Sequence, residues 1–96
     1  MRRDDALRML RDLKPRFSEM NIRRMAIFGS VARDEAAAGS DLDILIDVQT
    51  RPFTLLDMAR TQRELQEYMG VPVDLLTFNS MRQGKHDHIL NEVVDV

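Results

Sequence analysis

The chain has 96 residues, which is enough for one small sheet and a few helices, and we expect residues 1–96 to form a single domain. Its 14 Lys and Arg against 16 Asp and Glu give a net charge of -2, which argues against a protein that binds nucleic acid over an extended surface. The absence of cysteine excludes disulfides, thiolate zinc sites and cysteine nucleophiles, and no apolar run is long enough to span a bilayer, so a cytoplasmic location is expected.

The first third of the chain predicts a broken helix followed by a buried strand. Leucine and phenylalanine recur at helical spacing over residues 4–19, and Pro15 should split that helix because proline removes a hydrogen bond and clashes with the preceding turn. The continuous apolar run Met25–Phe28 predicts a strand that is buried on both faces. This strand ends at Gly29–Ser30, and a short helix over residues 31–37 should follow.

Residues 41–48 alternate between aliphatic and mostly acidic positions, which is the pattern of a strand. One face of this strand would carry Leu42, Ile44, Ile46 and Val48. The other would carry Asp41, Asp43, Leu45 and Asp47. The strand is therefore expected to pack with one face and to present carboxylates on the other.

The next predicted element is a capped helix that leads to a third strand. Thr54, with Asp57 three residues later, can cap the start of this helix, and Gly70 is suited to end it. Its apolar stripe would consist of Leu55, Ala59, Leu65 and Met69. A strand over residues 71–76 should follow, and it carries Asp74.

The C-terminal part of the chain predicts a helix and an edge strand. Ser80, with Gln83 after it, is expected to cap a helix that contains Ile89 and Leu90, and residues 93–96 should form a short edge strand. Strands that alternate with helices indicate an α/β fold, in which helices pack on a small mixed β-sheet.

The spacing of the aspartates predicts a metal site. Asp41 and Asp43 are one residue apart on a strand, so their carboxylates project from the same face, and like charges this close are unfavourable without a cation. Mg²⁺ binds through a few carboxylates together with substrate phosphates. If the strand that carries Asp74 pairs beside this one, three carboxylates could hold two metal ions about 3.5–4 Å apart, the arrangement that clamps both oxygens of an in-line displacement.

The turn at Gly29–Ser30 has the features of a phosphate site. Glycine lets a phosphate approach the backbone closely, and the free N–H groups at the start of the following helix attract an anion. The Ser30 hydroxyl adds a donor, and Arg33 lies one helical turn later, where its fork of donors could reach a phosphate or a carboxylate.

The combination of Gly29-Ser30, a ten-residue spacer, Asp41-Leu42-Asp43 and a later Asp74 resembles the nucleotidyltransferase superfamily of DNA polymerase β. More narrowly, the whole chain is similar to the minimal nucleotidyltransferase antitoxins, which are partners of HEPN-domain toxins. A polymerase β-like nucleotidyltransferase fold is therefore expected. Because so small a core is marginal, assembly with a partner protein or with a second copy is also expected.

The resemblance implies roles for individual residues. Asp41 and Asp43 would bind two Mg²⁺ ions, and Asp74 would bind the catalytic ion and help to deprotonate the attacking hydroxyl. Gly29 and Ser30 would hold the triphosphate of ATP, from which AMP passes to a tyrosine of the HEPN toxin. The family commonly has glycine after the arginine, where this chain has Asp34, and this departure places a negative charge near the phosphate site.

Several of these residues also have an ordinary structural interpretation. Asp74 is also compatible with an edge-strand surface position, and Arg33 is almost equally suited to a structural ion pair. Asp47 lies further along the strand and is interpreted as a surface residue or as one that supports the site. His86 and His88 are two positions apart on a predicted helix, so they point in different directions and favour solvated polar residues over metal ligands.

Two other functions remain open at this point. A non-catalytic antitoxin would neutralise its toxin by covering it, with the carboxylates as an inherited site. A small transferase acting on a metabolite or drug would need an acceptor-binding region that the sequence does not indicate.

Overall fold

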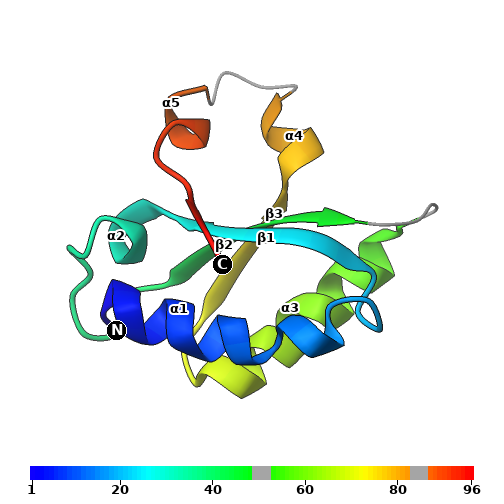
Figure 1. Ribbon diagram of the computed structural model, residues 1–96, viewed down its shortest axis with the longest axis horizontal. Coiled ribbons are helices and arrows are strands. Elements are labelled where there is room, and N and C mark those ends of the chain that lie inside the picture. The colour runs from blue at the N-terminus through cyan, green and yellow to red at the C-terminus, as the bar shows by residue number, and fades with distance from the viewer. Residues whose placement is uncertain (49–52, 83–86) are drawn as a thin grey trace.

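The computed structural model describes residues 1–48, 53–82 and 87–96, and in that part of the chain four strands form one sheet in the order β3-β2-β1-β4 (Figure 1). The strands are β1 (Ile22–Phe28), β2 (Leu42–Val48), β3 (Val73–Thr77) and β4 (Val94–Asp95). β1 runs antiparallel to β2 and β4, whereas β2 and β3 are parallel. The small mixed sheet that the sequence predicts is confirmed.

Helices lie on both faces of this sheet (Figure 1). They are α1 (Arg3–Asp12), the 3-10 turn η1 (Lys14–Arg16), α2 (Gly29–Ala32), α3 (Leu55–Met69), α4 (Phe78–Arg82) and α5 (Asp87–Leu90). The face that packs against α1 and α3 is called the closed face below. The face that carries Ala26, Leu45 and the aspartates of β2, and that packs only against α4 and α5, is called the open face.

The alternation of β2 is the reason why the two faces differ. Its aliphatic positions Leu42, Ile44, Ile46 and Val48 all belong to the large cluster of the closed face. Leu45 belongs to the smaller cluster of the open face, together with Phe28 and Phe78. The predicted inward and outward positions of this strand are therefore confirmed.

Proline splits the first helix, as predicted. α1 ends at Asp12 and the chain continues as η1, in which Pro15 takes a position that needs no helical N–H donor. Asn21 then adopts a left-handed conformation, with φ of 63°, and turns the chain into β1. β1 begins three residues before the apolar run from which it was predicted, because its first residues pair with the far end of β2.

The caps of α3 match the prediction, but its predicted apolar stripe is partly wrong. The Asp57 N–H donates to Thr54 Oγ1 at 3.2 Å, the Thr54 N–H donates to Asp57 Oδ2 at 2.8 Å, and Gly70 ends the helix in a left-handed conformation. However, Leu55 is 89% exposed and Ala59 is also exposed.

The stripe of α3 that contacts the sheet consists of Thr61, Leu65 and Met69. These residues are spaced by four and lie on one side of the helix, from which Ala59 is turned away, whereas Leu55 is the first residue of α3. The Thr61 hydroxyl is satisfied although it is buried, because it donates to the Asp57 carbonyl at 2.8 Å.

Two other predicted helices differ from the structure. α2 begins at Gly29 and ends at Ala32, and it does not extend to residue 37, because Asp34 adopts a left-handed φ of 59°. Ser80 lies inside α4 and does not begin the last helix, and its N–H donates to Oγ1 of Thr77, the last residue of β3, at 3.0 Å. Gln83 lies outside the described residues.

The C-terminal edge strand is confirmed as β4, which pairs with Ala26 and Ile27 of β1. The third strand is also confirmed, although it spans Val73–Thr77. No helix among the described residues is long and apolar enough to cross a membrane.

Candidate active site

The site is assembled at one end of the sheet, where β1 ends and β2 and β3 begin. β2 and β3 are parallel and in register, so Asp43 lies directly beside Asp74, which is the pairing that the sequence argument required. On the other side of Asp43 is Phe28, the last residue of β1, and Gly29 follows it at the start of α2. Asp41 is exposed and precedes β2 by one residue.

Partial burial and neighbouring negative charge both act on Asp43. Its pKa is raised above the ordinary aspartate value, first because the side chain is partly removed from water, and then because Asp74 and Asp41 place negative charge near it. The positive charge of Arg33 acts in the opposite direction and lowers the pKa of Asp43. A bound cation would relieve the same repulsion.

Gly29 is required at its position for two independent reasons. Its φ of +73° lies in the left-handed region that side chains disfavour. In addition, a Cβ at this position would overlap Asp43 Oδ2 and would lie 3.0 Å from Asp43 Cγ. The absence of a side chain at Gly29 therefore leaves room for the Asp43 carboxylate, a requirement that no local sequence pattern indicates.

The donor set suits a hard divalent cation, because it offers only carboxylate oxygens on a face that is partly open to solvent. Within residues 1–48, 53–82 and 87–96, no three acidic or imidazole groups are already gathered closely enough to hold a metal ion. Asp41, Asp43 and Asp74 repel one another, so closing them around a common point would require the charge of the ion.

Arg33 lies at the end of α2 and contacts two glutamates. Its Nε donates to Glu35 Oε2 at 3.2 Å, and its Nη1 lies 3.5 Å from Glu92 Oε2. It therefore makes structural ion pairs and also acts on Asp43 through its charge. The partly buried Ser30 lies between Gly29 and Arg33 in the chain, and its carbonyl accepts the Glu35 N–H at 2.8 Å.

Asp34, where the family pattern has glycine, occupies a conformation that glycine adopts easily. Its φ is 59°, which aspartate tolerates better than most residues. Its Oδ1 accepts the Arg3 N–H at 3.1 Å, and Arg2 lies 3.9 Å from its Oδ2. Arg2 provides no side-chain cap for α1, so Asp34 caps that helix from a distant part of the sequence.

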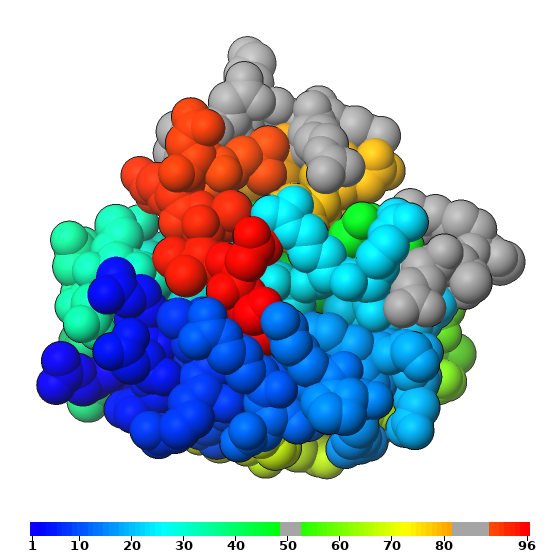
Figure 2. Space-filling view, viewed as in Figure 1, coloured from blue at the N-terminus to red at the C-terminus, as the bar shows by residue number. Residues whose placement is uncertain are grey.

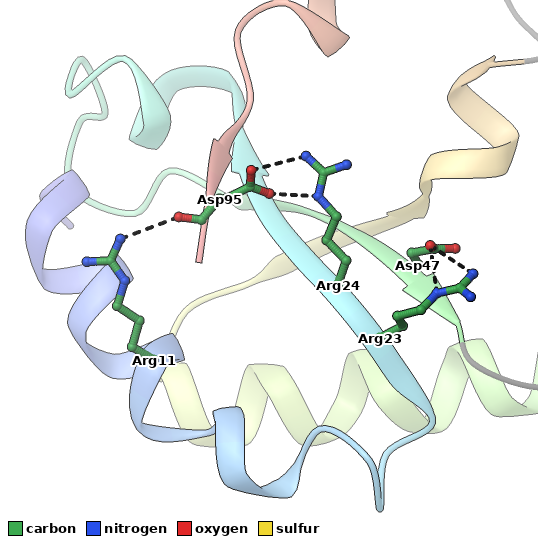
Figure 3. A network of polar contacts seen from close by, with 5 residues as sticks. All are labelled: Arg11, Arg23, Arg24, Asp47 and Asp95. Atoms are coloured by element: carbon green, nitrogen blue, oxygen red, sulfur yellow. Dashed lines mark hydrogen bonds and ion pairs between the residues drawn. The ribbon is translucent and has the colours of Figure 1, made fainter.

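The remaining polar residues singled out in the sequence lie elsewhere. Asp47 pairs with Arg23 at 3.0 Å, at the opposite end of β2 from the aspartates beside Gly29 (Figure 3). His86 lies outside the described residues, as does the side chain of His88, so the interpretation of that pair stays a prediction.

Two adjoining hollows among the described residues lie away from the carboxylates. The larger has a volume of about 360 Å³ and lies between η1 and α3, with Leu13, Leu65 and Tyr68 in its lining. The other has a volume of about 270 Å³ and shares Arg16 and Glu64 with it. Both lie on the closed side of the sheet and contain none of the residues predicted to act on phosphate.

Residues 10–96 match the model of the nucleotidyltransferase domain family. A relative from Methanocaldococcus jannaschii that is named as a protein adenylyltransferase is 43% identical over 86 residues, which cover 90% of this chain and 91% of the relative. The protein adenylyltransferase MntA of Thermococcus cleftensis is 36% identical over 86 residues, which cover 90% of this chain and 83% of the relative.

Solved structures share the fold. One that is described as a minimal nucleotidyltransferase has a TM-score of 0.81 and 29% identity, and the match covers 100% of this chain and 97% of the other. A chain in the crystal structure of a toxin–antitoxin with AMP-PNP has a TM-score of 0.64 and 16% identity, over 99% of this chain and 72% of the other. At that identity the second similarity shows the fold alone.

Proposed function

This chain belongs to the nucleotidyltransferase domain family, and on that basis we propose that it transfers AMP from ATP to a hydroxyl group of a partner protein. The partner in this proposal is a HEPN-domain toxin, the acceptor is a tyrosine, and the chain acts as the antitoxin. The observation that carries the proposal is the position of Asp43, beside Asp74 on a parallel strand and against Gly29 at the end of β1.

The proposed reaction is an in-line displacement at the α-phosphorus of ATP. The hydroxyl oxygen of the acceptor forms a bond to this phosphorus, the bond to the bridging oxygen breaks, and pyrophosphate leaves. Two Mg²⁺ ions would supply charge neutralisation for the phosphates and orientation of the reacting oxygens. Asp41 and Asp43 would hold both ions, and Asp74 would hold one and help to accept the proton of the hydroxyl.

Gly29, Ser30 and Arg33 are the residues proposed to hold the triphosphate. Gly29 has no side chain to separate the nucleotide from the backbone, and Ser30 can donate a hydrogen bond from its hydroxyl. Arg33 would contribute positive charge next to Asp43. Catalysis in this arrangement depends on positioning and electrostatics and needs no covalent intermediate with the protein.

A protein acceptor is supported by the names of two relatives that this chain resembles over most of their length. A toxin as that acceptor is supported by the sequence resemblance to minimal nucleotidyltransferase antitoxins and by the shared fold with a toxin–antitoxin complex that contains AMP-PNP.

Intact mass spectrometry of the partner toxin tests this function. The toxin is incubated with the chain, ATP and Mg²⁺, and we expect its mass to increase in steps of one AMP. The double variant Asp41→Asn, Asp43→Asn should form the complex without this increase. A stable complex in which the wild-type chain adds no mass would contradict the enzymatic account and favour an antitoxin that acts by covering its toxin.

A further inference from the structure

The ion pair between Arg33 and Glu92 joins the candidate active site to a distant part of the chain. Arg33 follows α2 and Glu92 follows α5, so 59 positions separate them, and Arg33 Nη1 lies 3.5 Å from Glu92 Oε2. Glu35 also contacts Arg33, but it is only two residues away in the same loop. Glu35 therefore moves with Arg33, whereas Glu92 can fix Arg33 relative to the sheet.

The segment that carries Glu92 is itself firmly attached. Its backbone pairs with β1 through β4, and the Val96 N–H donates to the Met25 carbonyl at 3.0 Å. Asp95 binds Arg24 through both carboxylate oxygens, at 2.8 and 3.1 Å, and the Asp95 carbonyl accepts from Arg11 at 3.4 Å (Figure 3).

Further contacts support this segment and the residue that binds it. The guanidinium of Arg24 lies 4.4 Å above the Phe78 ring, which gives Arg24 a fixed position of its own. In the space-filling view the C-terminal residues lie directly against α1 (Figure 2). The Glu92 N–H also donates to the Ile89 carbonyl at 3.0 Å. Glu92 is consequently a fixed point and not the end of a mobile tail.

The geometry of Arg33 leaves part of its guanidinium available. A guanidinium has five N–H donors, and the two glutamates contact Nε and Nη1. In the described part of the chain, Nη2 makes no hydrogen bond. The Arg33 N–H donates to the Gly29 carbonyl at 3.1 Å, and Gly29 lies directly against the Asp43 carboxylate.

We propose that Glu92 is a positioning residue, which holds Arg33 at the end of α2, one helical turn after Gly29, so that the free edge of the guanidinium receives the triphosphate of the nucleotide. This inference rests on the proposed function, because it assigns Arg33 to the nucleotide. In this proposal β4 and Glu92 support the nucleotide site without contacting the nucleotide.

Calorimetric titration with AMP-PNP and Mg²⁺ tests this role without requiring turnover. Because exposed ion pairs are individually weak, we expect Glu92→Gln to weaken binding about three- to fivefold, with Arg33→Ala having a larger effect. Glu92→Gln in the Arg33→Ala background should produce no further loss, because the residue it positions is absent. In turnover measurements, the KM for ATP should rise while kcat changes less than KM.

Glu67→Gln is the matched control, because Glu67 is an exposed glutamate on α3 that makes no ion pair with the described residues. It should bind AMP-PNP like the wild type, and thermal unfolding should show that all variants are folded. Unchanged or tighter binding by Glu92→Gln, or equal losses with and without Arg33, would overturn the positioning role while leaving the proposed function intact. A wild-type chain that fails to bind AMP-PNP would overturn both.

Discussion

The closed and open faces of the sheet differ in what their side chains contribute. On the closed face, aliphatic residues of all four strands pack against α1 and α3 in one large cluster. On the open face, three buried residues of β1 and β2 form a smaller cluster with two of α4, and Asp43 and Asp74 lie beside each other on neighbouring strands. The closed face therefore supplies the burial that stabilises the fold, while the open face accepts an unfavourable group of charges. Stability and activity should consequently respond to different substitutions.

The largest effect is expected on the open face, at Asp43. Asp43→Asn removes a negative charge but keeps the shape of the side chain, so we expect AMP transfer to fall about 10³-fold, because charge stabilisation by metal ions is worth several kcal/mol. Initial rates of AMP incorporation measure this loss. Asp47→Asn is the control on the same face of β2, and it should remain close to wild type. Transfer by Asp43→Asn at the wild-type rate would mean that the chemistry occurs elsewhere.

Ile44, the residue after Asp43 on β2, should affect stability and leave activity unchanged. Ile44 is fully buried on the closed face, and Ile44→Ala should lower the free energy of unfolding by about 3 kcal/mol, because it leaves a cavity. Urea denaturation measures this change, and the folded fraction should keep its specific activity. Leu56→Ala, at an exposed position of α3, should change stability by less than about 0.5 kcal/mol. Equal costs for the two substitutions would contradict the assignment of the core.

Gly29 is the position where stability and transfer activity should change together. Gly29→Ala has to adopt a left-handed conformation, which costs about 1–2 kcal/mol, and its Cβ must also displace Asp43. The control is Gly39→Ala, which has a similar φ of +82° but no atom within 4 Å of the added Cβ. Both variants should lose stability in denaturation, but only Gly29→Ala should also lose transfer activity. Full activity in Gly29→Ala would show that Asp43 can move without consequence.

The cap of α3 should affect stability alone. Thr54→Ala removes a reciprocal cap and should cost about 1 kcal/mol. Hydrogen bonds from the Thr54 backbone and side chain lower the pKa of Asp57, so the cap stabilises the fold above the ordinary aspartate pKa, and this contribution is lost as the pH falls through the lowered value. Thr54→Ala should therefore lose less stability on acidification than the wild type does. If the free energies of unfolding of Thr54→Ala and of the wild type fall equally as the pH is lowered, this linkage is wrong.

The smallest effect concerns the charge of Asp43. Because its pKa is raised in the folded state, the folded chain keeps this proton to a higher pH than the unfolded chain, and stability falls as the pH rises from the ordinary value through the raised one. Asp43→Asn should remove this fall and should slightly raise Tm at neutral pH in the presence of EDTA. Mg²⁺ should raise the Tm of the wild type more than that of the variant. A lower Tm for Asp43→Asn with EDTA would contradict the repulsion inferred here.

Local patterns in the sequence predicted most of the fold. The alternation of β2 specified which side chains enter the core, and Pro15, Thr54 and Gly70 correctly marked the ends of helices. The aspartates could be placed because the spacing of two residues fixes one face of a strand, and because β3 pairs in parallel beside β2.

The features that the sequence did not predict depend on contacts between distant residues. Leu55 and Ala59 fit a helical stripe with Leu65 and Met69, but which positions of α3 are buried depends on its packing against the sheet, and there Thr61 takes their place. Asp34 ends α2 and caps α1, a role that requires knowledge of where α1 begins in space. The contact of Arg33 with Glu92 joins residues 59 positions apart, and no local pattern indicates it.

Amide NMR spectra of the chain during titration with AMP-PNP and Mg²⁺ locate the nucleotide site, because backbone amides of both faces are observed in one experiment. We expect the signals of Gly29, Ser30, Asp43 and Asp74 to shift most. The double variant Asp41→Asn, Asp43→Asn should not show these changes. Changes confined to the hollow between η1 and α3, or spectra that do not respond to the nucleotide, would contradict the assignment of the open face as the nucleotide site.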